Sequence, residues 1–282
     1  MIRLVRLKKT LKWCVLLMQK MLPEKVFDAC YSIGFPAYKT VVRYLYLLAG
    51  IVLYGFSSSN KWRMVKKIFS IMPYTLVGIG GLEATYQAAT DLNRRHIPGD
   101  FVELGVARGG CAALMGITLF DSYMPDRHDR KLWLFDSYEG LPDPTEEDFS
   151  SSWDRSTGDH VRPLPKGSCL GTLEEVKRLM FQIMNFPEDK LVFIKGWFQD
   201  TIPQTIMKID KIALLRIDGD WYESTKCCLE GLYDKVVPGG AVIIDDYESC
   251  YGCKKAVDEF ISDRCITTNV ELDGRGGCYF TK

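Results

Sequence analysis

The sequence lacks several features that would define its class at once. It has only three histidines in 282 residues, no internal repeat and no low-complexity segment. Its longest uncharged apolar run, residues 44–56, is shorter than the roughly 20 residues that a membrane-spanning helix needs. A transmembrane anchor is therefore the least favoured interpretation of this run. Apolar residues nevertheless make up 47% of the chain, which excludes a fibre and a disordered protein.

The chain has no excess charge of either sign, since 36 basic residues balance 36 acidic ones. The balance hides an asymmetry: residues 1–70 carry a net charge of +11, and the remainder carries −11. An acidic body argues against a nucleic-acid partner, and a basic, apolar N-terminus favours an anionic lipid surface. We therefore expect peripheral membrane contact through residues 1–56. For the run 44–56, a buried core helix or a dimer interface is an equal alternative.

The ten cysteines do not have the spacing of a secreted disulfide scaffold, and no convincing signal peptide precedes them. We expect a reducing compartment, and hence a cytoplasmic protein that is either free or peripheral on the inner face of the membrane. Cys250 and Cys253 have the spacing of a metal or redox pair but stand alone, so we expect free thiols.

From Asp100 onward, short apolar runs alternate with helix-period segments. Strands are predicted at 101–106, 132–136, 191–195, 212–217 and 241–245, and helices near 110–121, 173–186, 201–206, 222–236 and 253–264. Strands that are apolar on both faces indicate a mostly parallel, doubly wound α/β sheet. Residues 267–272 and 278–281 resemble a hairpin that adds an antiparallel strand at one edge. We place a helical N-terminal extension at 1–70 and one domain at 71–282.

Acidic residues follow the predicted strands at the edge where ligands bind in such sheets. Asp136 ends the second strand, where a carboxylate can accept two hydrogen bonds from a ribose diol. Asp218 ends the fourth strand, and Asp245 and Asp246 end the fifth. This like-charge cluster needs neutralisation, and its hard oxygen ligands favour Mg²⁺. Asp220 is better explained as a helix N-cap.

The first strand leads into a glycine-rich turn, Glu103-Leu-Gly-Val-Ala-Arg-Gly-Gly110. Gly105 and Gly109 would let the backbone approach a ligand closely. The turn lacks the second glycine of the dinucleotide fingerprint, which weakens the alternative of a nucleotide-dependent oxidoreductase. The segment from Tyr138 to Gly171 is too long for a plain connection and is interpreted as a lid.

Five segments together resemble the macrocin O-methyltransferase (TylF/MycF-type) family over roughly residues 70–282. They are 101–110, 135–142 (Phe-Asp-Ser-Tyr-Glu-Gly-Leu-Pro), 196–201 (Gly-Trp-Phe-Gln-Asp-Thr), 218–225 (Asp-Gly-Asp-Trp-Tyr-Glu-Ser-Thr) and 239–253. The resemblance implies a seven-stranded Rossmann-like class I methyltransferase, S-adenosylmethionine, a divalent metal and a sugar hydroxyl as methyl acceptor.

The resemblance also assigns roles to individual residues. Asp218, Asp245 and Asp246 would bind the metal, with Asp218 also the general base. Cofactor binding would fall to a larger set: Thr75, Leu76, Glu103, Gly105 and Gly109 near the methionine part, Asp136 and Ser137 near the ribose, and Gly196 and Trp197 beside the adenine. Leu76 stands where the family usually has methionine. Which of Asp218 and Asp220 faces the ion stays open.

We therefore expect a metal-dependent O-methyltransferase acting on a sugar-containing substrate, and a homo-oligomer. The alternatives are the oxidoreductase and a membrane-associated binding subunit without activity. The sugar, the hydroxyl and the form of the acceptor, whether free, lipid-linked or polymeric, are not specified by the sequence.

Overall fold

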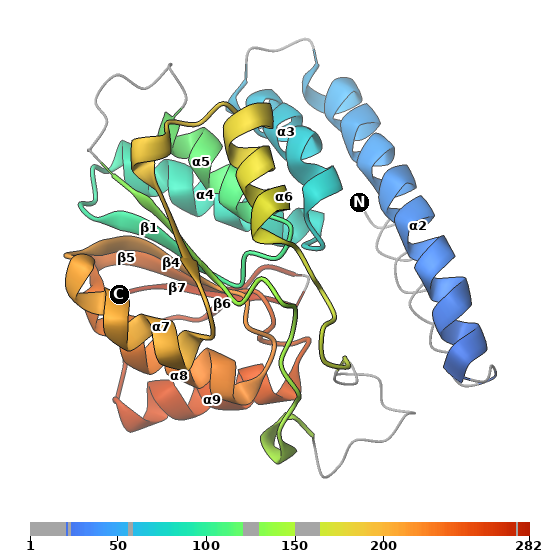
Figure 1. The fold of residues 1–282 in the computed structure, drawn as a ribbon. Helices are drawn as coiled ribbons and strands as arrows, with labels where there is room; N and C mark the ends of the chain where they lie inside the picture. The colour runs from blue at the N-terminus through green and yellow to red at the C-terminus, as the bar shows by residue number, and fades with distance from the viewer. Residues whose placement is uncertain (1–20, 22–23, 56–58, 121–129, 150–163, 275) are drawn as a thin grey trace. The chain divides into compact units, whose positions relative to one another are not determined.

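The computed structural model describes residues 21, 24–55, 59–120, 130–149, 164–274 and 276–282 (Figure 1). The chain divides into two compact units. One consists of residues 1–62 with 152–158, and the other of residues 63–151 with 159–282. Each is described by itself below.

The first unit contains one long helix, α2 (Glu24–Tyr54). It includes most of the apolar run found in the sequence, and it continues through Pro36, whose carbonyl oxygen accepts a hydrogen bond from the Thr40 hydroxyl at 2.9 Å. Several apolar side chains of α2 are exposed, among them Leu48 at 56% and Val52 at 78%. Among the described residues, no helix is long and apolar enough to cross a membrane.

The second unit is built on a seven-stranded sheet with the order β3-β2-β1-β4-β5-β7-β6. The strands are β1 (Asp100–Leu104), β2 (Leu132–Asp136), β3 (Leu191–Lys195), β4 (Ile212–Ile217), β5 (Val236–Ile244), β6 (Glu271–Leu272) and β7 (Cys278–Thr281). The first five are parallel, and β7 is antiparallel to both β5 and β6. Every residue of β2 and β4 is buried, as expected for central strands that are covered on both faces. The predicted doubly wound sheet with an antiparallel edge is confirmed.

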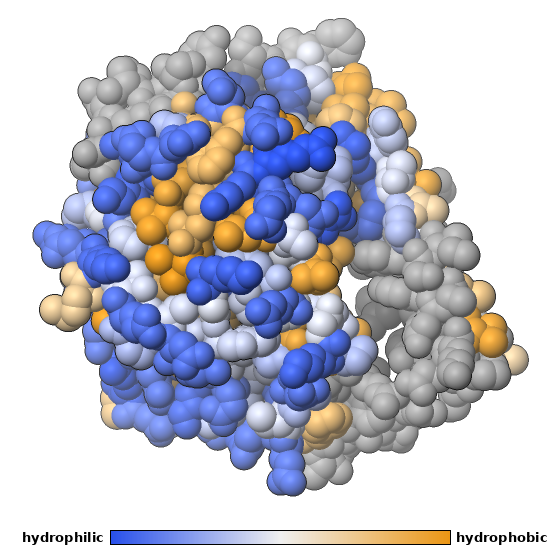
Figure 2. All heavy atoms as spheres, viewed as in Figure 1, coloured by the Kyte–Doolittle hydropathy of each residue, from blue (hydrophilic) through white to orange (hydrophobic). Residues whose placement is uncertain are grey.

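Helices cover both faces of this sheet (Figure 1). One face carries α3 (Asn60–Ile71), α4 (Ile79–Arg94), α5 (Gly110–Phe120) and α6 (Leu173–Lys177), and the other carries α7 (Phe198–Thr205), α8 (Tyr222–Leu232) and α9 (Tyr251–Asp263). Short helical turns connect them: η1 (Met72–Tyr74), η2 (Glu146–Asp148), η4 (Glu188–Lys190), η5 (Ile206–Lys208) and η6 (Tyr233–Lys235). The face seen in Figure 2 is mostly hydrophilic with several apolar patches. A large cluster of buried apolar side chains lies between the sheet and α7, α8 and α9.

Several elements depart from their predicted bounds, and three of these departures are described here. β1 ends at Leu104 because Gly105 has a left-handed φ of +89°. The helix predicted over 173–186 is α-helical only to Lys177 and then widens into the π-helical turn η3 (Arg178–Ile183). β5 begins five residues early, at Val236, with an irregular register against β4. Of the predicted lid, residues 150–163 lie outside the described part of the chain.

Candidate active site

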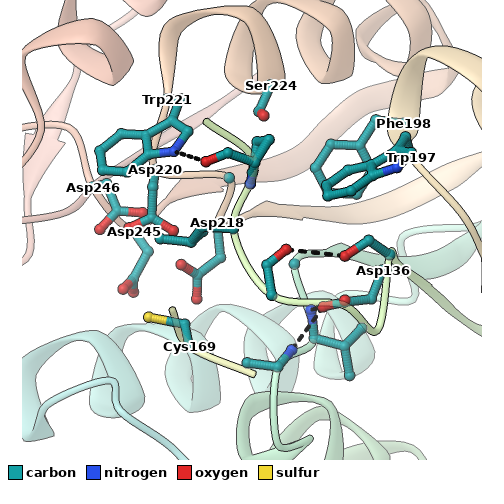
Figure 3. A pocket seen from close by; sticks show the side chains of 18 of the residues that line it. Asp136, Cys169, Trp197, Phe198, Asp218, Asp220, Trp221, Ser224, Asp245 and Asp246 are labelled. Atoms are coloured by element: carbon teal, nitrogen blue, oxygen red, sulfur yellow. Dashed lines mark hydrogen bonds between the residues drawn. The ribbon is translucent and has the colours of Figure 1, made fainter. Parts of the chain in front are cut away.

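A cavity of about 690 Å³ lies at the carboxyl ends of the parallel strands (Figure 3). It brings together nearly all of the predicted site residues: Thr75, Leu76, Glu103, Gly105, Asp136, Ser137, Gly196, Trp197, Asp218, Asp245 and Asp246. Gly109 does not line it. A methyl group at Gly109 would instead lie 3.1 to 3.2 Å from the side chains of Val176, Leu179 and Met180, so this glycine serves the packing of the turn against α6 and η3.

The glycine-rich turn passes very close to the segment that follows β4. A methyl group at Gly105 would lie 1.8 Å from the carbonyl oxygen of Asp218, and the φ of +89° disfavours any side chain there. The Asp218 N–H donates to the carbonyl oxygen of Leu104 at 2.8 Å. The first turn and the acidic segment are therefore fixed against each other by their backbones.

The Asp136 carboxylate organises the same turn. Its Oδ2 atom accepts hydrogen bonds from the N–H groups of Val106 at 2.7 Å and Ala107 at 2.8 Å, and its Oδ1 atom accepts one from the N–H of Tyr138 at 2.6 Å. Burial raises the pKa of Asp136, and these three hydrogen bonds oppose that rise. These backbone bonds use three of the about four acceptor positions of the carboxylate, and its contact with a ribose stays a prediction.

The other predicted cofactor contacts surround this turn. The Ser137 hydroxyl donates to the carbonyl oxygen of Gly140 at 3.1 Å, and the Thr75 hydroxyl accepts from the N–H of Val77 at 3.0 Å. Leu76 is 40% exposed. Trp197 precedes α7 and lies beside Phe198 at the Asp136 end of the cavity (Figure 3). This end therefore combines an aromatic wall with a polar floor, which suits a nucleoside.

The opposite end of the cavity is acidic. Carboxylate oxygens of Asp218, Asp245 and Asp246 lie within 4.8 Å of one another, close enough to share one cation. A second group within the same limit joins Asp220, Asp246 and the thiol of Cys250. Asp220 was expected to cap α8, but the N-cap residue of this helix is Trp221 and no side-chain cap hydrogen bond is made. Figure 3 shows Asp220 beside the other three aspartates, just before α8. The Asp220 backbone has a φ of +57°, a strained value that is often found at functional sites.

Burial and mutual repulsion shift the titration of this cluster. Burial raises the pKa of Asp246 well above its usual range, and the neighbouring carboxylates of Asp220 and Asp218 raise it further. Burial, followed by the charge of Asp218, raises the pKa of Asp220 to about 8. Burial raises the pKa of Glu103 to about 8, against the opposing charge of Arg216. In the absence of a further cation, the cluster therefore favours bound protons near neutral pH.

Arg216 is a central residue that the sequence analysis missed. It is fully buried in β4, and its guanidinium donates to Glu103, Asp218 and Asp245. An arginine inside the otherwise apolar run Ile212–Ile217 was the available signal, because a buried charge needs partners.

Asp148 was also missed, because its role depends on contacts far along the chain. Its Oδ1 atom accepts from the N–H of Tyr222 at 2.7 Å, and its Oδ2 atom accepts from the N–H of Thr145 at 2.8 Å. The indole N–H of Trp221 donates to the carbonyl oxygen of Pro142 at 3.2 Å. These bonds attach the first part of the predicted lid to the start of α8. Thr145 and Asp148 have the Thr-x-x-Asp spacing of a capping box, but no spacing would have indicated the bonds to Tyr222 and from Trp221.

The cysteine prediction agrees with the structure. All nine cysteines among the described residues are unpaired, including Cys250 and Cys253. Burial raises the pKa of both thiols, so they are held as neutral thiols and not as reactive thiolates.

A parallel sheet of this order, an antiparallel edge strand and a nucleoside-sized site beside a glycine-rich turn define a class I S-adenosylmethionine-dependent methyltransferase. Comparison with known proteins identifies the branch of this class. The family profile described as "Macrocin-O-methyltransferase (TylF)" matches residues 37–282, and the chain belongs to this family. It is therefore an O-methyltransferase, which decides against the oxidoreductase alternative.

Relatives of named activity support this assignment. The demethyldecarbamoylnovobiocin O-methyltransferase of Streptomyces niveus is 41% identical over 206 residues, which cover 71% of this chain and 74% of the relative. The 8-demethyl-8-(2,3-dimethoxy-alpha-L-rhamnosyl)-tetracenomycin-C 4'-O-methyltransferase of Streptomyces olivaceus is 32% identical over 215 residues, 76% of this chain and 78% of the relative. The solved structure of the O-methyltransferase NovP has a TM-score of 0.63 at 39% identity and covers 74% of this chain and 82% of its own.

Proposed function

We propose that the protein transfers the methyl group of S-adenosylmethionine to a sugar hydroxyl of a glycosylated small molecule, with the help of a divalent metal such as Mg²⁺. The observation that carries this proposal is the convergence of Asp218, Asp245 and Asp246 in the same cavity as the predicted cofactor-binding residues. The sugar is favoured by the tetracenomycin relative, whose substrate name contains a rhamnosyl group. The same cluster argues against the alternative of an inactive binding subunit, because retained like charges without a cation destabilise a fold.

The residues present fit a hard divalent cation. All three candidate ligands offer carboxylate oxygens, the donor type that Mg²⁺ prefers. The Oδ2 atom of Asp246 is buried and accepts no hydrogen bond. Arg216 brings one positive charge to a region that also holds Glu103 and Asp220, so the cluster stays acidic after this pairing. Asp218, Asp245 and Asp246 would therefore hold the ion.

The chain's own residues would then direct the displacement. When bound, the metal would lower the pKa of a coordinated hydroxyl. Asp218, whose side chain is 22% exposed in the cavity, would accept the hydroxyl proton as the general base. The oxygen would form a bond to the methyl carbon as the carbon–sulfur bond breaks, leaving a methyl ether and S-adenosylhomocysteine. The turn held by Asp136 and Gly105 would fix the donor, so that proximity supplies much of the rate.

Transfer of a labelled methyl group to a panel of desmethyl glycosides tests this function. We expect incorporation that is abolished by EDTA and restored by Mg²⁺. Asp218→Asn and Asp245→Asn should lose turnover at least a thousandfold while keeping affinity for S-adenosylhomocysteine. Asp189→Asn is the matched control, because its carboxylate is 74% exposed and pairs only with Lys190. Full turnover in EDTA would reject the metal, and glycoside binding by wild-type protein without any transfer would favour the inactive binding subunit.

We further infer that the N-terminal residues form an extension distinct from the catalytic domain, with the boundary at residue 62, where the two compact units divide, in place of the expected residue 70. We also infer that residues 1–56 bring the protein to the inner face of a membrane. The basic charge of this segment and the exposed apolar side chains of α2, such as Leu48 and Val52, support this role. The family match begins at residue 37, inside α2. Sedimentation with anionic vesicles in low and high salt tests the contact. If the protein does not sediment with the vesicles but elutes as a dimer, the exposed apolar side chains of α2 would instead belong to the interface of a homo-oligomer.

A further inference from the structure

The arginine beneath the aspartate cluster connects three strands of the sheet. Arg216 has a relative exposure of 0%, and its partner Glu103 has 1%. Its Nη1 atom donates to the Oε1 atom of Glu103 at 3.1 Å and to the Oδ2 atom of Asp218 at 2.9 Å. Its Nη2 atom donates to the Oδ1 atom of Asp245 at 2.7 Å. One guanidinium therefore contacts carboxylates that come from β1, from the end of β4 and from the end of β5.

The register of the sheet explains how these groups meet. Glu103 of β1 pairs with Arg216 of β4, and Arg216 pairs with Ile243 of β5. Because side chains alternate between faces, Asp218 and Asp245, each two residues further along its strand, lie on the same face as Arg216. The arrangement is thus dictated by the strand register, and it ends at the edge where the cavity opens.

Each contact uses one oxygen of a carboxylate and fixes its rotation. A guanidinium is planar and directs its N–H groups along set directions, whereas an ammonium group cannot hold three carboxylates in defined orientations. With Oδ2 of Asp218 and Oδ1 of Asp245 bonded to Arg216, the direction of the second oxygen of each carboxylate is set as well. The orientation of both carboxylates toward the proposed metal would therefore depend on Arg216.

We propose that Arg216 is a positioning residue that orients Asp218 and Asp245 for metal binding and ties them to Glu103 at the predicted cofactor end. This inference rests on the proposed function. Charge alone and orientation lead to opposite predictions for the loss of Arg216. If charge alone mattered, removal of this positive charge would strengthen binding of a cation. If Arg216 orients the aspartates, its removal weakens binding of the cation.

Two variants separate orientation from charge. Arg216→Lys keeps the positive charge and loses the planar fork. The double variant Arg216→Met with Glu103→Gln removes the two most deeply buried charges together, so that only the carboxylates of Asp218 and Asp245, which are 22% and 10% exposed, lose Arg216 as a partner. Arg130→Lys is the matched control, because Arg130 is also buried, at 4% exposure, but donates to the carbonyl oxygen of Ile97 at the far end of β1.

Binding of Mn²⁺ to the full chain, measured by the electron paramagnetic resonance signal of the unbound ion, is the readout. We expect both Arg216 variants to melt cooperatively and to bind Mn²⁺ at least tenfold more weakly than wild type, with Arg130→Lys within twofold of wild type. If Arg216→Lys does not fold, the double variant decides the question.

The possible results are distinguishable. Unchanged or tighter Mn²⁺ binding by a folded Arg216 variant would overturn the positioning role and leave the metal site intact. Wild-type protein that binds no Mn²⁺, or binds it equally well after Asp245→Asn, would instead overturn the proposed function on which this inference rests.

Discussion

The structure predicts a large effect of neutralising Asp136, and the effect should be on stability as well as on cofactor binding. Three backbone N–H groups donate to this carboxylate, from Val106, Ala107 and Tyr138. In Asp136→Asn, the amide oxygen can replace Oδ2 and keep two of these bonds, but the amide NH₂ then faces the N–H of Tyr138. Because a hydrogen bond to a charged group contributes about 1.5 to 3 kcal/mol, we expect a loss of about 2 kcal/mol in the free energy of unfolding.

Asp136→Ala should lower the free energy of unfolding further, by about 4 kcal/mol, because all three donors lose their acceptor. Two of these donors belong to the buried residues Val106 and Tyr138. Urea unfolding followed by circular dichroism gives these values, with S-adenosylhomocysteine affinity measured in parallel by calorimetry. Asp189→Asn is again the control and should stay within about 0.5 kcal/mol of wild type. If Asp136→Asn unfolds at the same urea concentration as this control, the carboxylate does not organise the turn and our reasoning is refuted.

Further predictions concern the turn, the titration of the site and its lid. Gly105→Ala should destabilise the protein by several kcal/mol, because the added methyl group would meet the carbonyl oxygen of Asp218. Gly167→Ala, at a similar φ of +80° but with open space around it, should destabilise the protein by only about 1 kcal/mol. Thermal melts compare the two variants, and equal losses of stability would contradict the contact at Gly105. Burial raises the pKa of Glu103 from 4.5 to about 8, so the folded state binds this proton more tightly than the unfolded state does. The metal-free protein should therefore lose stability as the pH rises from about 5 to 8. Urea titrations of Glu103→Gln should show a flatter dependence of stability on pH, and an unchanged dependence would contradict this role of Glu103. Asp148→Ala leaves the N–H of Tyr222 without its acceptor and should lower the unfolding free energy by about 2 kcal/mol. It should also speed cleavage by Glu-C after Glu146 or Glu147, and an unchanged cleavage rate would contradict the role of this contact.

Much of the fold followed from the sequence because central parallel strands are apolar on both faces. The bounds of β2, β3 and β4 agree with the prediction residue for residue. Where the bounds differ, the cause lies in backbone contacts that a sequence does not display, as at Gly105, or in a change of helix type, as in η3. Apolar periodicity cannot distinguish an α-helix from a π-helical turn over six residues.

The candidate site could be predicted in its acids but not in its connections. Strand ends placed Asp136, Asp218 and Asp245 at one edge, since parallel strands present their carboxyl ends together. The partners of these acids came from elsewhere: Arg216 from inside an apolar strand, and the backbone N–H groups of the turn. Side-chain pairing between strands depends on register, and register was unknown before the sheet was seen.

The central claim is that the three aspartates at the end of the cavity bind a divalent cation beside the methyl donor. Anomalous diffraction from crystals grown with Mn²⁺ and S-adenosylhomocysteine tests it most directly. The account predicts one strong peak bounded by the carboxylates of Asp218, Asp245 and Asp246, lost in Asp245→Asn crystals. A cavity that holds S-adenosylhomocysteine but shows no peak between these side chains would contradict it.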